Sequence, residues 1–138
     1  MPLSEKVRVE IFVPDLPDPI YNRILEELGD ELSYAFGGCT VTQAFGKYRS
    51  ASGAILPDKI NVLFTDAPFE WEKDRRIVEQ YVLELQNVVR RALGKEEAIL
   101  IAVYPIFHSQ LLELIRRDAL GPSGLVILGV LLLAVQAY

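Results

Sequence analysis

Two kinds of hydrophobic spacing alternate along the first hundred residues of the chain. Apolar residues recur at every second position over 7–13 and 60–64, which is the period of a strand with one buried face. They recur every three or four positions over 20–32 and 77–92, which predicts two amphipathic helices. A continuous apolar run over 98–104 predicts one more strand, buried on both faces.

Residues that begin and end helices stand at the borders of these segments. Asp18 followed by Pro19 predicts a helix start, because an Asp side chain caps free N–H groups and Pro is preset for the first turn. Gly37-Gly38 and Gly94 follow the two helical stretches and predict their ends. The helices should therefore begin and end cleanly.

Between the helices the spacing returns to two over 39–66, so we expect two strands joined as a hairpin, with a long loop that also holds Pro57. The resulting order is strand, helix, strand, strand, helix, strand. This order predicts an α+β, ferredoxin-like βαββαβ domain over residues 1–105, with an antiparallel sheet and both helices on one face. Residues 106–138 then form a C-terminal helical apolar extension.

The C-terminal extension differs in charge from the rest of the chain. The chain has 138 residues, a net charge of −5 and 51% hydrophobic residues, yet no charged residue follows Asp118. Residues 125–138 could be a membrane anchor, with Arg116 and Arg117 on the cytoplasmic side. Fourteen helical residues span only about 21 Å, however, and a bilayer core is about 30 Å thick. We therefore expect the extension to cover apolar protein surface, and keep membrane association as the alternative.

The sheet face away from the helices is the surface that the extension could cover. The last strand is apolar on both faces, and contiguous exposed apolar surface usually marks an interface. We expect an interface on this face and along the extension, within one chain or between subunits, with a homodimer as the simplest assembly. Its predicted members are Phe12, Leu63, Tyr104, Leu125, Leu128 and Leu132.

Charge and composition argue against several functions. A net charge of −5 and the lack of an aromatic RNA-binding signature argue against nucleic acid as a partner. One Cys and one His cannot build a Cys/His zinc site, and the spacing between Gly38 and Gly46-Lys47 does not fit a phosphate loop. We expect no metal and no cofactor. The absence of a signal-peptide pattern predicts a cytoplasmic protein, or a membrane-associated one if the extension inserts.

Three residues are candidates for catalysis. His108 is the single imidazole, Cys39 is the single thiol, and Tyr48 lies in the expected hairpin. The alternative to an interaction domain is a small-ligand-binding protein or enzyme of the dimeric α+β barrel type, and these three side chains would line its pocket. That alternative requires them to converge in one cavity. Without convergence, Cys39 is a small buried residue, and His108 is a partly exposed loop or helix-cap residue after the last strand.

The hairpin region also carries a recognisable pattern. Gly37-Gly38-Cys39-Thr40 is followed by Gly46-Lys47-Tyr48, then Gly53 and the strand at 59–64. Over about 30 residues this resembles an uncharacterised bacterial and phage family of small ferredoxin-like domains of unknown function, with a Gly-Gly-x-Thr and Gly-x-aromatic hairpin. The resemblance implies the ferredoxin-like fold and a structural or binding role for the hairpin residues, and it supplies no activity. The family often has Trp where this chain has Tyr48.

Overall fold

The computed structural model describes residues 3–94 and 99–109, and in this part of the chain it has the predicted α+β class. Residues 5–106 belong to one compact unit, and the described residues 3–4 and 107–109 belong to a second unit. The predicted order of strands and helices is confirmed. The elements are β1 (Leu3–Pro14), α1 (Pro19–Phe36), β2 (Thr40–Arg49), β3 (Ile55–Ala67), α2 (Trp71–Leu93) and β4 (Leu100–Ser109).

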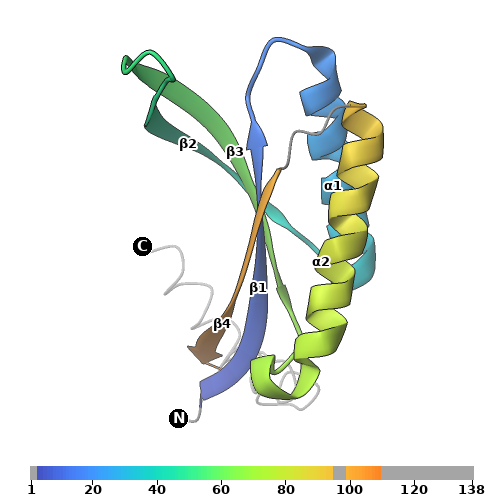
Figure 1. The fold of residues 1–138 in the computed structure, drawn as a ribbon. Helices are drawn as coiled ribbons and strands as arrows, with labels where there is room; N and C mark the ends of the chain where they lie inside the picture. The colour runs from blue at the N-terminus through green and yellow to red at the C-terminus, as the bar shows by residue number, and fades with distance from the viewer. Residues whose placement is uncertain (1–2, 95–98, 110–138) are drawn as a thin grey trace, which may run out of the picture. The chain divides into compact units, whose positions relative to one another are not determined.

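The four strands form one sheet in the order β2-β3-β1-β4, and α1 and α2 cover one of its faces (Figure 1). β3 pairs antiparallel with both of its neighbours, and Ile11 of β1 and Val41 of β2 both lie opposite Leu63. The β1 ladder ends at Pro14 opposite Ile60, so the β2–β3 hairpin continues beyond the end of β1 (Figure 1). The opposite face of the sheet carries no helix among the described residues.

The predicted helix ends are confirmed. The Asp18 carboxylate accepts a hydrogen bond from the Ile20 N–H at 3.0 Å, and Pro19 opens α1. Gly37 (φ 88°) and Gly94 (φ 60°) end the two helices in the left-handed conformation that favours glycine. The N–H of Trp71, the first residue of α2, donates to the Glu5 carboxylate at 3.1 Å, so β1 caps α2 from a distance in sequence.

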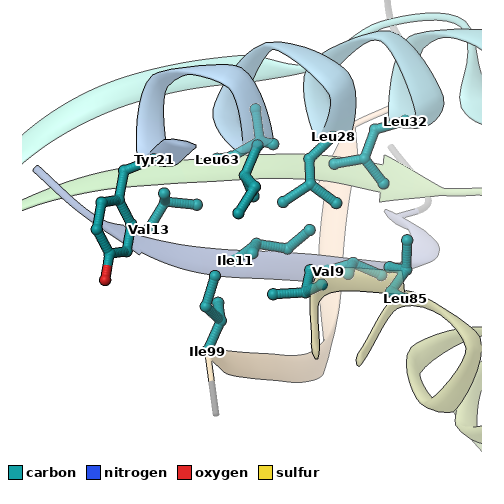
Figure 2. Packing of buried hydrophobic residues seen from close by; sticks show 11 residues of the cluster. Val9, Ile11, Val13, Tyr21, Leu28, Leu32, Leu63, Leu85 and Ile99 are labelled. Carbon is teal, nitrogen blue, oxygen red and sulfur yellow. The ribbon is translucent and has the colours of Figure 1, made fainter. Parts of the chain in front are cut away.

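The hydrophobic core lies between the sheet and the helices. Alternate residues of β1 are buried, and they pack under one face of each helix (Figure 2). Burial of these side chains is the main stabilising contribution, at about 1.5–3 kcal/mol for each large one. The cluster contains Val9, Ile11, Val13, Tyr21, Ile24, Leu28, Leu32, Leu63, Leu85, Val89 and Ile99.

The prediction that Leu63 faces away from the helices is wrong. Its side chain is fully buried in the core, opposite Ile11 (Figure 2). The residues of β3 that face the helices are the less apolar set, since Asn61 and Thr65 are buried beside Leu63. Thr65 is accommodated because its hydroxyl donates to the Gly38 carbonyl at 2.7 Å, which offsets the cost of burying it.

Two strand boundaries also differ from the expectation. Pro57 lies within β3, opposite Lys47, and the loop of the hairpin is confined to residues 50–54. This position tolerates proline because the β1 ladder has already ended, so no neighbouring strand needs its missing N–H. The last strand continues through Pro105 to Ser109, which places His108 inside β4 and not after it.

The predictions for residues 125–138, including Leu125, Leu128 and Leu132, lie outside the described residues. The same holds for Arg116 and Arg117. Within the described residues, neither helix combines the length and the apolar character that crossing a bilayer requires.

Candidate functional site

The sheet face opposite the helices, which we call the open face, is the surface that the fold leaves uncovered within residues 5–106. Because the odd-numbered residues of β1 and β3 face the core, the even-numbered residues lie on the open face. Phe12 lies opposite Val62 on this face, as predicted for Phe12. Ile99, which precedes β4, is part of the core, and Ile101 and Val103 of β4 pack against it, so Leu100, Ala102 and Tyr104 lie on the open face. Leu100 is 64% exposed.

An ion pair lies at one end of the open face. The Arg8 guanidinium makes two hydrogen bonds to the Asp66 carboxylate, at 2.8 Å through Nε and 3.1 Å through Nη2. These hydrogen bonds raise the pKa of Arg8 above its ordinary value. The guanidinium also lies over the Phe64 ring, 4.4 Å from its centroid, in cation–π geometry. Arg8 is therefore held on both sides by its own sheet.

A second polar contact joins β1 to β4. The Tyr104 hydroxyl donates a hydrogen bond to the Glu10 carboxylate, and this bond raises the pKa of Tyr104. The two residues are far apart in sequence but lie on neighbouring strands. Since Arg8 and Glu10 both have partners within the sheet, the open face presents aromatic and aliphatic surface to a partner. Such a surface suits association with protein.

The β2–β3 hairpin exposes a further set of large apolar side chains. Phe45 is 73% exposed and Tyr48 is 51% exposed, although both lie within a regular strand. Apolar residues are exposed on both faces of the hairpin, since Phe45 and Tyr48 point to opposite sides of β2. The exposed members are Val41, Phe45, Tyr48, Ile55 and Leu56.

The structure does not bring the predicted catalytic residues Cys39 and Tyr48 together. Cys39 lies just before β2, where its thiol is within 3.5 Å of the Gly29 carbonyl and 3.6 Å of the Ser33 hydroxyl. Tyr48 lies nine positions further along an extended strand, which corresponds to about 30 Å. A cavity of ordinary size does not hold both side chains. Cys39 is half-buried and packs against the core beside α1.

His108 lies near the end of β4, and its Nδ1 is 3.2 Å from the Ser109 carbonyl oxygen. His108 belongs to a different unit from Cys39 and Tyr48, which both lie within residues 5–106. The described residues contain no cluster of three or more His, Cys, Asp or Glu side chains placed to hold a metal ion.

A groove that the sequence did not predict lies between α1 and α2. It has a volume of about 300 Å³, with an apolar floor that includes Leu28 and Leu85. Glu27, Glu31 and Glu84 also line this groove. Position 31 follows position 27 by one helical turn, which is the signal that could have placed both carboxylates on one side.

Tyr81 also lines this groove, and burial raises its pKa to about 12 from 10.0, with Glu31 and Glu84 adding to the shift. A raised pKa means that the folded state favours the neutral phenol. The stabilising contribution is therefore complete below pH 10 and is lost as the pH rises towards 12. We expect the free energy of unfolding to fall less steeply over this range in a Tyr81→Phe variant. Denaturant unfolding at several pH values measures the free energy of unfolding. An equal dependence of this free energy on pH in both proteins would contradict the expectation.

Comparisons with known proteins give similarities of fold at low identity. No family model and no curated protein matches this chain. A Bacillus cereus protein related to NIF3 is similar over 77% of this chain, with 17% identity and a TM-score of 0.48, and the chain spans only 27% of that protein. A phage SAM lyase, solved in complex with S-methyl-5'-thioadenosine, is similar over 77% of this chain and 92% of its own, with 15% identity and a TM-score of 0.44.

Proposed function

We propose that this protein is a non-catalytic interaction domain that associates with a second copy of itself through the open face of its sheet. One observation carries the proposal: β4 presents Leu100, Ala102 and Tyr104 on a face that no helix covers within residues 5–106. The charged groups beside them, Arg8 and Glu10, already have partners in the same sheet. Covering this face buries apolar area, and these contacts offset part of the cost of desolvating Arg8 and Glu10.

The uncharged end of the chain belongs to the same proposal. Residues 119–138 carry no charge, and their apolar side chains match the chemistry of the open face. We assign them to covering that face, on the same chain or on the second copy. A ferredoxin-like classification is also part of the proposal, supported by the βαββαβ order and the strand order β2-β3-β1-β4. So are membership of the family with the Gly-Gly-x-Thr hairpin and a cytoplasmic location.

The mass in solution of the intact chain, measured beside that of a chain ending at Asp118, tests this proposal. We expect the intact chain to be a dimer without detergent. The shorter chain should dissociate to a monomer or aggregate, because its open face is left bare. An intact monomer, with a shorter chain that is equally stable and equally monomeric, would refute the proposal. A requirement for detergent would favour the membrane-associated alternative.

A further inference from the structure

The outer edge of β2 is a long unpaired strand edge. β2 stands at the end of the strand order, and no strand pairs with its outer side among residues 3–94 and 99–109. Nine of its ten residues are exposed, and it contains neither a proline nor a break in its register with β3. Such an edge readily pairs with another strand, and proteins usually protect it with proline, bulges or a cover.

Two hydrogen bonds determine which groups of β2 point outward. The Ser50 N–H donates to the Ala54 carbonyl at 2.9 Å, so the alternation of an antiparallel ladder directs the even residues of β2 towards β3. The Asp15 N–H donates to the Lys59 carbonyl at 2.9 Å, so the odd residues of β3 point towards β1, which agrees. The N–H and C=O groups that point away from the sheet therefore belong to residues Val41, Gln43, Phe45, Lys47 and Arg49.

Charge selects the direction in which a second copy could pair with this edge. β2 contains no acidic residue, and its two basic residues, Lys47 and Arg49, lie at one end. Parallel pairing of two β2 strands would set like charges side by side, which is destabilising. Antiparallel pairing sets each basic residue opposite an uncharged one at the other end of the strand.

We propose that two copies of this chain pair antiparallel along β2, around a two-fold axis at Phe45. In this register all five outward-pointing residues of each strand find partners, which gives about ten main-chain hydrogen bonds. Phe45 pairs with Phe45 of the second copy, Gln43 with its Lys47, and Val41 with its Arg49. The Phe45 side chain, 73% exposed in one chain, is then covered.

The surface beside the start of β2 is complementary in charge to the basic end of β2 in the second copy. Val41 pairs with Leu63, whose side chain faces the helices, so Arg49 of the second copy arrives on the helix side of the sheet. Cys39 directly precedes β2, and its contacts with Gly29 and Ser33 identify the side of α1 that lies next to the start of β2. Glu26 lies one helical turn before Gly29, and Asp30 lies one helical turn before Ser33. Both acidic residues are exposed, so they can attract Arg49 of the second copy.

This inference goes beyond the proposed function, since it assigns a second surface of self-association, the outer edge of β2, in addition to the open face. A two-fold axis perpendicular to the sheet keeps both open faces on the same side. The two four-stranded sheets then form one continuous sheet, and its open face is twice as wide.

A cysteine at the axis tests the register. In a Cys39→Ser background, Phe45→Cys sets two thiols on residues whose Cα atoms are about 5.5 Å apart, within disulfide range. We expect a disulfide-linked dimer under mild oxidation. Gln43→Cys in the same background is the matched control, because its two copies lie about 13 Å apart along the strands. A Gln43→Cys crosslink as efficient as that of Phe45→Cys, or no crosslink from either, would overturn the register.

Amide hydrogen exchange on the unmodified chain provides a measurement that does not depend on a variant folding. In a single chain the odd amides of β2 face solvent and exchange fast, whereas pairing protects them. We expect slow exchange at Gln43, Phe45 and Lys47 at high protein concentration, and faster exchange on dilution. An intact dimer with fast exchange at these amides would overturn this inference and leave the proposed function standing. A monomeric intact chain would refute both.

Discussion

Replacing Leu63 with Ala should lower the free energy of unfolding by about 3 kcal/mol. Leu63 is fully buried at the centre of the sheet, where it pairs with Ile11 on one side and Val41 on the other. Removing its isobutyl group loses the free energy of burial and leaves a cavity that the two neighbouring strands cannot close, and such substitutions cost about 2–5 kcal/mol. Denaturant unfolding with an unchanged m-value measures the loss.

The matched control is Leu56→Ala, the same substitution in the same strand. Leu56 lies opposite Tyr48 in the hairpin, beyond the end of the β1 ladder, and is 38% exposed. We expect a cost below about 1 kcal/mol there, because little buried volume is lost. Equal costs at the two positions would contradict the assignment of Leu63 to the core and favour the opposite alternation of β3.

Replacing Leu100 with Glu should weaken self-association through the open face at least tenfold, or about 1.4 kcal/mol. Leu100 is 64% exposed on the open face, so the chain can fold with a polar residue there, whereas an interface on this face would have to bury a carboxylate. The concentration at which the intact dimer dissociates, measured by sedimentation equilibrium, reports the change. The free energy of unfolding of the dissociated chain should change little.

Leu83→Glu controls for the added charge. Leu83 lies on α2, on the opposite side of the domain from the open face, and is 58% exposed. It matches Leu100 in residue type and closely in exposure. We expect no change in association from this variant. If Leu83→Glu dissociated the dimer and Leu100→Glu did not, the helices would be the associating surface and the open face would not.

Local signals predicted most of the fold because they act over a few residues. Asp18 with Pro19, Gly37 and Gly94 mark the helix ends through capping and the left-handed conformation, which need no distant partner. The alternation of β1 identified its buried face correctly. The alternation of β3 was misread, because Ile60, Val62 and Phe64 form its more apolar set, while the buried set contains Asn61 and Thr65.

The sequence does not reveal which distant group each polar side chain contacts in the folded chain. Thr65 is buried because a carbonyl at the end of α1 accepts its hydrogen bond, and no spacing within β3 reveals that partner. The same applies to the candidate site. Tyr104 was predicted on the open face from its place in an apolar strand, but its bond to Glu10 depends on the order of the strands.

The sequence also could not show which N–H and C=O groups of β2 point away from the sheet. Their identity depends on the phase of the ladder with β3, which the bond between Ser50 and Ala54 at the hairpin loop sets. A loop one residue longer would change this phase.

Sedimentation velocity of the intact chain over a range of concentrations shows directly whether this chain associates with itself. We predict a species with at least twice the mass of one 138-residue chain, which gives way to the monomer on dilution. A single species with the mass of one chain at every concentration would contradict the account.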